Sequence, residues 1–379
     1  MQGYSEYELG DLLEYEQPTA YIVESTDYSD SYSVPVLTAG KSFILGYTNE
    51  MEGVFDKTPV IIFDDFTTAT QYVNFPFKVK SSAMKILHIN KDLVLPKYIY
   101  YRIQIIQFDH STHKRYWIQQ YSKIRVSIPP IPEQERIVAR IEELFSQLDA
   151  GVETLKKTKA QLAVYRQAVL KEAFENISTF VPLSDVCQRV FDGPFGSNLK
   201  TSDYVSCGVR VVRLENLKNM WFDDSKQSFI ANEKYELIAS HTVFPTDLIM
   251  STFISDSIKV CRLPNYIEYA VNKADCVGIR LSDNVNPDFV MFWLSSKEAY
   301  NRLSHQIHGA TRPRVNTKQI KALQIPSVKK EVQDKIVSVI QEKFSVCDNI
   351  EQTINIALQQ AEAMRQSILK DAFEGRLLI

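Results

Sequence analysis

Apolar residues recur at seven-residue spacing in two long segments of the chain, residues 137–175 and 336–374. This spacing places apolar side chains along one line of an α-helix and predicts a seam between paired helices. Small residues near the seam, such as Gly151 and Ala357, permit close approach. We therefore expect the two helices to pack against each other, in an antiparallel pair because the chain must return after a globular domain. The predicted seam residues are Ile141, Leu148, Leu155, Leu162, Val169, Ile340, Cys347, Ile354, Ala361 and Ile368.

The two helical segments are also copies of each other. Aligned without a gap, roughly 16 of about 39 positions are identical, and both copies end in the pattern R-Q-x-x-L-K-x-A-F-E. Prolines precede each copy, at Pro129, Pro130 and Pro132 before the first and at Pro326 before the second. Proline ends a strand and is tolerated in the first turn of a helix, so these residues mark the boundaries.

The segments that precede the two helices are similar in length and carry short runs of Val, Ile, Tyr and Phe between turn residues, as in 59–63 and 208–213. Such runs are typical of mixed α/β domains. The predicted fold class is α+β, with two globular mixed α/β domains separated by two long antiparallel helices that form a coiled coil. About 43 helical residues would span about 65 Å. The predicted boundaries are 1–130 for the first domain, 131–176 for the first spacer helix, 177–327 for the second domain and 328–379 for the second spacer helix.

The composition of the 379 residues is that of a soluble globular protein, with 45% hydrophobic and 23% charged residues. Its 43 Lys and Arg against 46 Asp and Glu give a net charge of -3, which excludes a uniformly basic nucleic-acid coat protein. No apolar run approaches the roughly 20 residues of a membrane helix, and the start of the chain lacks a signal-peptide pattern. We expect a cytoplasmic protein with no membrane association, and reduced core thiols at its five widely spaced cysteines.

Local charge nevertheless points to a nucleic-acid partner. Residues 78–130 carry about ten Lys and Arg against two Asp. Within them, residues 113–117 mix cations with aromatic rings, which suits contact with phosphates and bases. Residues 312–316 of the second domain hold a comparable place before the boundary, and Arg and Asn match guanine and adenine edges. Either cluster alone favours a solvated loop, but recurrence in both domains favours nucleic acid.

Motifs for catalysis are missing from the sequence. It has no phosphate-binding P-loop, no nucleophile elbow and no H-E-x-x-H zinc helix. Asp64 and Asp65 lack the further residues of a metal-dependent nuclease site and are expected in a solvated turn. Two His-x-x-His pairs lack the Cys or carboxylate ligands that a zinc site needs. The loop 193–197 is expected to be a tight turn whose small residues let a partner approach.

The boundary-and-helix units resemble the specificity subunit of Type I restriction-modification systems. The matching segments are 128–136 (IPPIPEQER), 137–175, 193–199 (GPFGSNL), 309–316 (GATRPRVN) and 336–377. With the domain order, the resemblance covers nearly the whole chain, and the paired boundaries and helices are its specific part. At the second boundary, residues 327–333 replace the expected P-E-Q run, which leaves equal docking of two partner copies open.

The resemblance implies a non-catalytic subunit that recognises double-stranded DNA. Each globular domain would bind one half of a split asymmetric sequence, while the helices would set the gap and dock two methylation subunits. S-adenosylmethionine, ATP and Mg would belong to the methylation subunits and to ATP-dependent restriction subunits, a translocase and nuclease, with no cofactor or metal on this chain. The DNA contacts predicted on this basis are Lys78, Lys80, His113, Lys114, Arg115, Tyr116, Gly193, Phe195, Ser197, Asn198, Lys200, Thr311, Arg312, Arg314 and Asn316.

Three other interpretations stay open at this point. The chain could serve a related system in which modification and cleavage share one partner polypeptide. It could instead be a coiled-coil scaffold that links or dimerises proteins without meeting DNA, since periodicity alone fits that role as well. A stand-alone enzyme is the third, although no cofactor-binding loop supports it.

Overall fold

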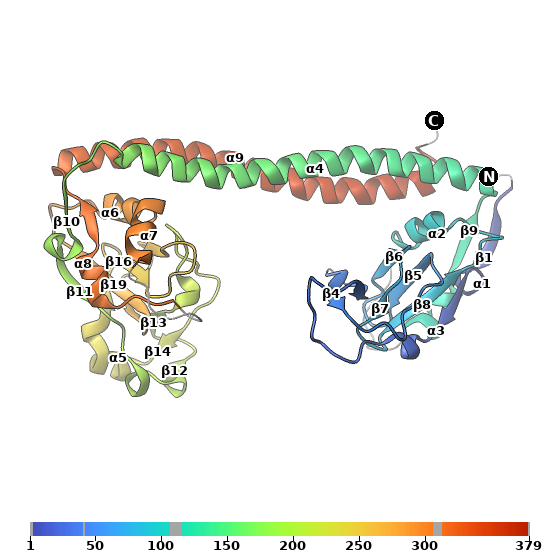
Figure 1. The fold of residues 1–379 in the computed structure, drawn as a ribbon, viewed down its shortest axis with the longest axis horizontal. Coiled ribbons are helices and arrows are strands. Elements are labelled where there is room, and N and C mark those ends of the chain that lie inside the picture. Colours follow the sequence, from blue (N-terminus) through green and yellow to red (C-terminus); the bar gives the residue numbers. More distant parts are fainter. Residues whose placement is uncertain (1–2, 41, 107–115, 306–312, 378–379) are drawn as a thin grey trace. The chain divides into compact units, whose positions relative to one another are not determined.

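The chain divides into two compact units in the computed structural model. Unit 1 comprises Met1–Leu155 and Asn355–Ile379, and unit 2 comprises Lys156–Ile354. Two long helices, α4 (Ile131–Phe174) and α9 (Lys330–Phe373), each contribute one part to each unit (Figure 1). Each unit is therefore a globular domain with the adjoining parts of both helices. The described part of the chain is residues 3–40, 42–106, 116–305 and 313–377.

The domain of unit 1 combines strands with short helices. Its strands are β1 (Ser5–Glu8), β2 (Leu13–Glu16), β3 (Val34–Leu37), β4 (Ile44–Thr48), β5 (Val60–Asp64), β6 (Thr70–Val73), β7 (Lys78–Val79), β8 (Met84–Ile89) and β9 (Arg125–Ile128). Its α-helices are α1 (Leu9–Leu12), α2 (Pro96–Ile103) and α3 (Tyr116–Gln119), and its 3-10 helices are η1 (Pro18–Tyr21) and η2 (Tyr121–Lys123). The strands form a four-stranded antiparallel sheet in the order β2-β8-β5-β6, a three-stranded sheet in the order β4-β3-β7, and a β1-β9 pair.

Strand β5 is the centre of this domain and is buried on both faces. Ile61 and Phe63 belong to the core cluster that also holds α2, whereas Val60 and Ile62 belong to a second cluster on the other face. Burial on both faces explains why the run is continuously apolar rather than alternating. Helix α2 lies on the side of the sheet next to α4 (Figure 1).

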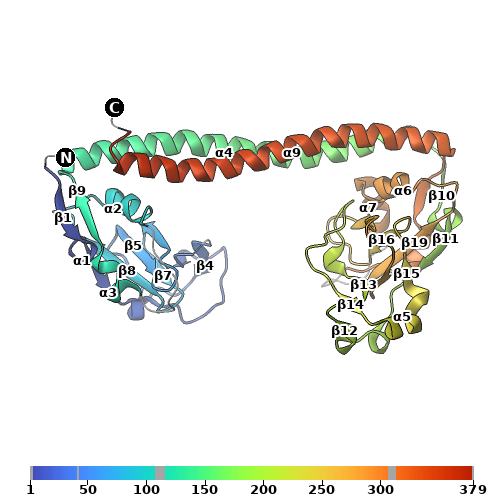
Figure 2. The same cartoon turned by 180° about the vertical axis from the view of Figure 1, so that it is seen from behind.

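The domain of unit 2 follows a related plan with more strands. They are β10 (Phe180–Pro182), β11 (Cys187–Phe191), β12 (Tyr204–Val205), β13 (Val209–Val212), β14 (Phe229–Ile230), β15 (Thr242–Val243), β16 (Leu248–Ser251), β17 (Val260–Arg262), β18 (Ala270–Asn272), β19 (Cys276–Leu281) and β20 (Gln324–Pro326). The helices are α5 (Asn232–Ile238), α6 (Pro287–Leu294), α7 (Lys297–Ser304) and α8 (Thr317–Ala322), with 3-10 helices η3 (Leu183–Val186), η4 (Gly196–Asn198), η5 (Thr201–Asp203), η6 (Leu214–Asn216) and η7 (Ala239–His241). The sheets have the orders β11-β19-β16-β17 and β12-β14-β13-β18-β15, and β10 pairs with β20. Figure 2 shows α6 and α7 between the β16-β19 sheet and the long helices.

The repeated ending of the two helices docks each helix end on a domain. At the end of α4, Phe174 packs with ring centroids 5.4 Å from Phe289 and 5.2 Å from Trp293 in unit 2. At the end of α9, Phe373 packs 5.3 Å from Tyr98 in unit 1. The apolar part of the R-Q-x-x-L-K-x-A-F-E pattern therefore supplies core residues to the domain at which each helix ends.

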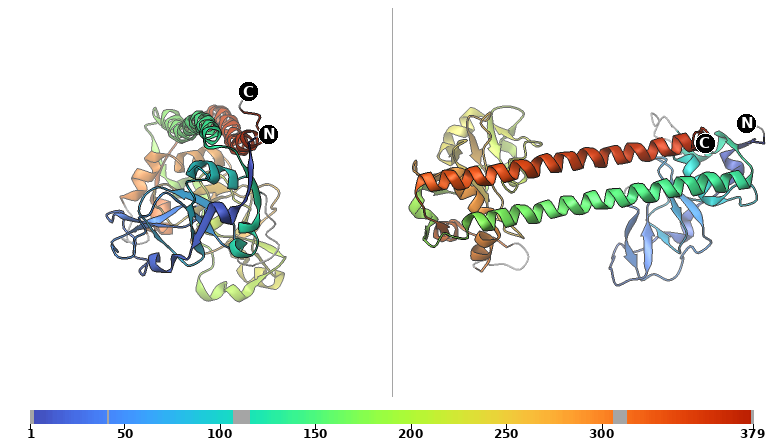
Figure 3. Two further views of the ribbon diagram at one scale, coloured as in Figure 1. Left: turned by 90° about the vertical axis from the view of Figure 1, so that its right-hand side faces the viewer. Right: turned by 90° about the horizontal axis from the view of Figure 1, so that it is seen from above.

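The arginine of the same pattern ties the helices together. In unit 2, Arg166 of α4 forms ion pairs with Asp348 (2.7 Å) and Glu351 (2.9 Å) of α9, and in unit 1 Arg365 of α9 pairs with Asp149 of α4. In unit 2 a further ion pair joins Glu172 of α4 to Lys343 of α9 at 2.8 Å. Residues later in α4 therefore pair with residues earlier in α9. The helices therefore run antiparallel within each unit, side by side in Figure 3.

The predicted mixed α+β class with two long helices is confirmed. All ten residues predicted to line the seam are buried or half-buried. Two of the core clusters include residues of both helices: Ile141 shares one with Leu369 in unit 1, and Val169 shares one with Ile340 in unit 2. At these positions the helices also pack on the domain cores, and the seam between them stays a prediction.

A glutamine near the start of each long helix bridges the helix to its domain by the same hydrogen bonds, although the second boundary lacks the P-E-Q run. The side chain of Gln134 accepts a hydrogen bond from the N–H of Leu95 (2.7 Å) and donates to the carbonyl five residues earlier (2.8 Å). Gln333 accepts from the N–H of Asn286 (2.8 Å) and likewise donates five residues back (2.9 Å). The departure seen in sequence therefore preserves this contact.

All five cysteines are free thiols, as expected, but they are not all core residues, because Cys207 is exposed. Burial raises the pKa of the Cys187 and Cys261 thiols to about 12. In the described part of the chain, no helix has the length and apolar character needed to cross a bilayer.

Candidate nucleic-acid interface

Three loops of unit 1 meet at Asp65, which directly follows β5 and is 1% exposed. Its N–H donates to the carbonyl of Ala83 (3.1 Å), and its own carbonyl accepts from the N–H of Tyr116 (3.1 Å). Its carboxylate accepts from the N–H of Trp117 (2.9 Å). These bonds join the β5-β6 turn, the β7-β8 turn and the start of α3.

A buried ion pair keeps this junction charged inside the domain. The ammonium of Lys85 lies 3.8 Å from the Asp65 carboxylate, both side chains being 2% exposed, and it also donates to the carbonyl of Ser82 (2.7 Å). The neighbouring Asp64 caps the turn by accepting from the N–H of Phe66 (2.8 Å). Asp64 thus occupies the turn expected from the sequence, but the solvated position expected for Asp65 is wrong, because Lys85 balances its charge within the core.

The DNA contacts predicted in unit 1 fall into three groups. Lys80 is exposed in the β7-β8 turn. Lys78 is 4% exposed and pairs with Glu50 at 2.7 Å, which lowers the pKa of that carboxyl to about 2, and Tyr116 is 1% exposed. DNA cannot reach Lys78 or Tyr116 without disrupting the core, so these two expectations are corrected. The others, His113, Lys114 and Arg115, lie outside the described residues.

In unit 2, the loop from Gly193 to Leu199 is a rigid projection. A Cβ at Gly193 would lie 2.1 Å from the carbonyl carbon of Lys273, so the backbone approach there requires glycine. Pro194 and Leu199 are buried, which fixes both ends of the loop. The intervening four residues, which include the predicted contacts Phe195, Ser197 and Asn198, are exposed, as is the predicted Lys200 after them.

Two carboxylates connect this loop to the segment that begins at Pro313. Asp192 accepts from the hydroxyl of Thr317 (3.4 Å), and its carbonyl lies 2.6 Å from Nδ1 of His241. Asp275, at a left-handed φ of +70°, accepts from the guanidinium of Arg314 at 3.3 Å. Burial, reinforced by the negative charge of Asp275, raises the pKa of Asp192. The two motifs singled out in the second domain therefore meet in one place.

Arg314 and Asn316 have different settings at this junction. The Arg314 side chain is 51% exposed and lies over the ring of Phe253 at 4.2 Å, so its guanidinium is positioned yet accessible. Asn316 is the N-cap of α8, and its side-chain oxygen accepts from the N–H of Gln319 (2.9 Å). That oxygen is committed to the helix, which argues against the predicted adenine contact through a full amide fork. The predicted Thr311 and Arg312 lie outside the described residues.

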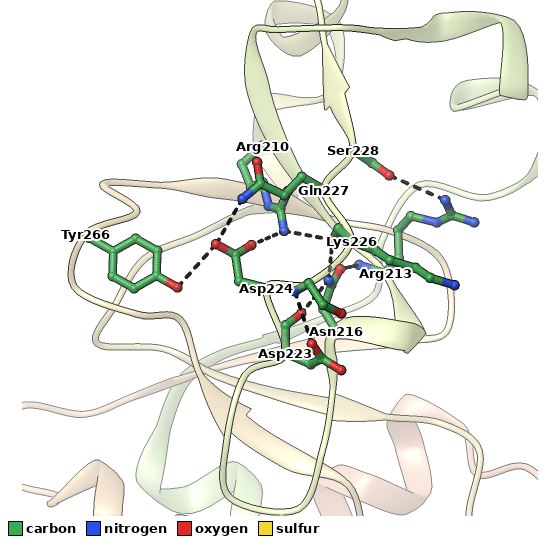
Figure 4. Close-up of polar contacts among 10 residues, drawn as sticks. Arg210, Arg213, Asn216, Asp223, Asp224, Lys226, Gln227, Ser228 and Tyr266 are labelled. Atoms are coloured by element: carbon green, nitrogen blue, oxygen red, sulfur yellow. Dashed lines mark hydrogen bonds and ion pairs between the residues drawn. The ribbon is translucent and has the colours of Figure 1, made fainter. Parts of the chain in front are cut away.

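A further polar cluster surrounds Arg210 of β13, which is 6% exposed (Figure 4). Its guanidinium forms an ion pair with Asp224 and donates to the carbonyl of Lys226 (3.1 Å). Asp224 also accepts from Gln227 (3.1 Å) and from the hydroxyl of Tyr266 (3.2 Å). The buried charge is thus balanced within the domain, and the cluster fixes the loop before β14.

Comparisons with known proteins decide the family. The sequence profile of the Type I restriction modification DNA specificity domain matches residues 1–163 and 180–360, which is most of the chain. The chain belongs to this family. No group of three or more His, Cys, Asp or Glu that could hold a metal ion occurs among the described residues of this specificity-family chain.

Several specificity subunits are similar to this chain. That of the Type I restriction enzyme EcoR124I/EcoR124II of Escherichia coli is 45% identical over 174 residues, 43% of each protein. That of EcoKI, from Escherichia coli K12, is 23% identical over 68% of this chain and 58% of the relative. The chain therefore spans about half the length of these first curated relatives. The MjaVIII subunit of Methanocaldococcus jannaschii is 21% identical over 98% of this chain and 92% of its own length.

A solved chain from work on the complex assembly and conformational transition of the type I R-M system shares the fold, with a TM-score of 0.69, 15% identity and 99% coverage of each chain. The sequence predicts the exposed loops of this specificity-family fold but gives no role to the acids that organise the loops of unit 2, Asp192 and Asp275. It also predicts a solvated position for Asp65, which is buried. A usable signal existed, because each acid directly follows or precedes buried strand residues, where a charged side chain needs a partner.

Proposed function

We propose that this chain is the DNA sequence-recognition subunit of a Type I restriction-modification complex and reads a bipartite asymmetric site, one half-site per globular domain. The observation that carries the proposal is the loop junction in each unit. In unit 1 the β7-β8 turn, which carries the exposed Lys80, is joined to Asp65 through Ala83, and in unit 2 the exposed Arg314 pairs with Asp275. Cations position a duplex through its phosphates, and a few side chains read base edges. Since different elements build the two junctions, two different half-sites are expected.

Arg314 is the strongest base reader that we propose. Its guanidinium is held by Asp275 and by the face of Phe253 but remains half-exposed, which presents its fork in a fixed direction. Ser197 and Asn198 lie on the projecting loop of the same junction and complete the proposed readers of unit 2. In unit 1 we retain Lys114 and Arg115, which lie outside the described residues.

The helices have two proposed roles. Each is 44 residues long, which corresponds to about 66 Å, and an uninterrupted helix of this length suits a spacer that sets the gap between half-sites. We also propose that two methylation subunits dock on the helices, completed by ATP-dependent restriction subunits. We assign S-adenosylmethionine, ATP and Mg²⁺ chemistry to these partners, because the family of this chain is named for DNA specificity.

Mapping of methylated adenines in the host genome, with and without the gene, tests the main proposal. A bipartite motif that disappears with the gene is expected. In the complex with methylation subunits, Arg314→Ala should then weaken binding at one half-site about 5- to 160-fold, the cost of a lost bidentate base contact of about 1–3 kcal/mol, while the other half-site is retained. Unchanged footprints and methylation patterns would remove Arg314 from the readers, and binding that does not weaken with salt would count against DNA recognition.

A length change tests the spacer. Inserting seven residues at matched positions of α4 and α9 adds about 10 Å of helix, which corresponds to about three base pairs of B-DNA. The tolerated gap should lengthen while both half-sites stay the same. Lys156→Gln, an exposed substitution in α4 that keeps its length, is the matched control. A gap that is unaltered by the insertion contradicts the spacer role.

A further inference from the structure

Each unit holds an exposed phenylalanine at the tip of a turn in its loop junction. Phe66 in the β5-β6 turn is 52% exposed, and Phe195 in the loop before η4 is 58% exposed. Single exposed apolar residues are common on protein surfaces, so exposure alone means little. Here the two rings share their setting: each stands on a hydrogen-bonded turn of a loop junction that also holds an exposed cation, Lys80 in unit 1 and Arg314 in unit 2.

The backbone under Phe66 is fixed from both sides. The side-chain carboxylate of Asp64 accepts hydrogen bonds from the N–H groups of Phe66 (2.8 Å) and Thr67 (3.1 Å). The backbone carbonyl of Asp64 accepts from the N–H of Thr68 (2.9 Å). Asp65, the residue between, is buried in its pair with Lys85. The ring therefore points outward from a turn that has little freedom to collapse, next to the β7-β8 turn that carries a lysine.

The backbone under Phe195 is held by different contacts with the same result. Buried Pro194 precedes it and buried Leu199 follows the loop. The N–H of Asn198 donates to the Phe195 carbonyl (3.0 Å), which closes the turn. Gly193, packed on the backbone of Lys273, ties the loop to the β18-β19 turn whose Asp275 holds Arg314.

A rigid phenyl ring beside phosphate-binding cations suits one ligand chemistry, the stacked bases of a duplex. Apolar side chains can enter between base pairs and unstack them, and stacking on a base is favourable whatever its identity. Because the turns are already fixed, little conformational entropy is lost when the ring is inserted. A protein partner would also accept an exposed ring, but nothing would then require one ring beside the cations of each unit.

We propose that Phe66 and Phe195 are wedges, one for each half-site, that insert between base pairs and unstack the duplex where each domain binds. This inference rests on the proposed DNA-recognition function and adds to it the unstacking of base pairs within each half-site. Specificity then depends partly on how easily a half-site opens at the inserted step, and flexible pyrimidine–purine steps are favoured there.

The test uses the complex with methylation subunits and duplexes carrying the mapped site, with 2-aminopurine placed at successive positions of each half-site. The wild-type complex should raise 2-aminopurine fluorescence at one step in each half. Phe195→Ala should abolish the signal in one half and weaken binding about 5- to 100-fold, and Phe66→Ala should do so in the other half. Phe195→Leu should keep part of both effects, because leucine can still act as a wedge.

Matched controls separate the wedge from general surface effects. Trp221→Ala in unit 2 and Met51→Ala in unit 1 remove side chains of similar or greater exposure, at 57% and 71%, and should leave the fluorescence signal and the affinity unchanged. Unaltered fluorescence and affinity in both phenylalanine variants overturn the wedge while leaving DNA recognition intact. Loss of methylation-subunit binding instead identifies a protein contact and also overturns it. Absence of specific binding by the wild-type complex refutes the proposed function itself.

Discussion

The two units attach to the long helices in the same way but hold their exposed loops in different ways. Phe174 and Phe373 end the helices in the domain cores, and Gln134 and Gln333 bridge each helix start to the domain. Phe174 and Phe373 belong to the sequence repeat, and Gln134 and Gln333 precede it at matching positions. Shared residues at shared positions indicate a common task in both units, the attachment of a domain to the helix pair.

The loop junctions do not repeat. In unit 1 the organising acid, Asp65, is buried with Lys85, whereas in unit 2 Asp275 is 25% exposed and pairs with the half-exposed Arg314. A buried ion pair holds the first junction, and an ion pair that solvent can reach holds the second. The attachment to the helices is therefore constant between the units, whereas the exposed loops are held by different contacts.

Removing the helix-end rings should have the largest effect. Phe174→Ala should lower the free energy of unfolding by about 3–5 kcal/mol, since it deletes a buried ring from the core of unit 2. Phe373→Ala should cost less, because Phe373 is only half-buried. Urea denaturation followed by near-UV circular dichroism measures both, with Leu237→Ala, which truncates a 79% exposed side chain, as a surface control. Equal losses would show that the two attachments are energetically the same.

Neutralising the acids should separate the two junctions. Asp65→Asn removes the negative charge beside the buried ammonium of Lys85 and should cost about 3 kcal/mol. Asp275→Asn, at a solvent-reached pair, should cost less than about 1 kcal/mol. Chemical denaturation of both variants gives the difference. Adding Lys85→Met to the Asp65 change should recover stability, and failure to do so would mean that the charge pair is not the cause.

The helices themselves differ on their exposed faces. Val332, Val339 and Val346 are exposed at seven-residue spacing on α9. The aligned positions of α4 carry Glu133, Arg140 and Gln147. If a methylation subunit covers the apolar face, Val339→Glu should weaken its binding about tenfold, which corresponds to about 1.5 kcal/mol of lost apolar burial. Titration calorimetry or pull-down with the methylation subunit measures this, and Arg140→Glu is the matched control. Equal effects of the two substitutions would argue for symmetrical docking.

The smallest expected effect is a pH dependence of opposite sign in the two domains. The hydrogen bond from Lys78 holds the pKa of Glu50 at about 2 against an ordinary 4.5, so its stabilisation is full above about pH 4.5 and is lost as pH falls toward 2. Burial raises the pKa of Asp192, so its ionisation costs stability as pH rises through that raised value.

Two variants check these signs. The destabilisation caused by Glu50→Gln should be largest near neutral pH and vanish toward about pH 2. Asp192→Asn should gain stability relative to the unmodified chain as pH rises above the ordinary carboxyl range. Free energies of unfolding at several pH values measure both, and parallel pH profiles for the two variants would contradict the opposite environments inferred for these carboxyls.

Much of the architecture could be predicted because its signals are local and repeated. The R-Q-x-x-L-K-x-A-F-E ending and the apolar runs around residues 59–63 and 208–213 point to long helices and mixed domains without knowledge of contacts. The positions of the loop residues are harder to predict from sequence. Lys78 is predicted to contact DNA because it begins the basic run of residues 78–130, but Glu50, distant in sequence, balances its charge inside the domain.

Periodicity and repeated motifs along the chain predict the repeat, the two long helices, the mixed domains and the family resemblance. The folded structure was needed to show that Asp65 and Asp275 organise the loops, that Tyr116 lies in the core and that Asn316 caps a helix. The physical reason is that burial and partnership of a polar group depend on residues distant in sequence. A charged side chain can be stable in the core or at the surface, and its neighbours in space select between the two.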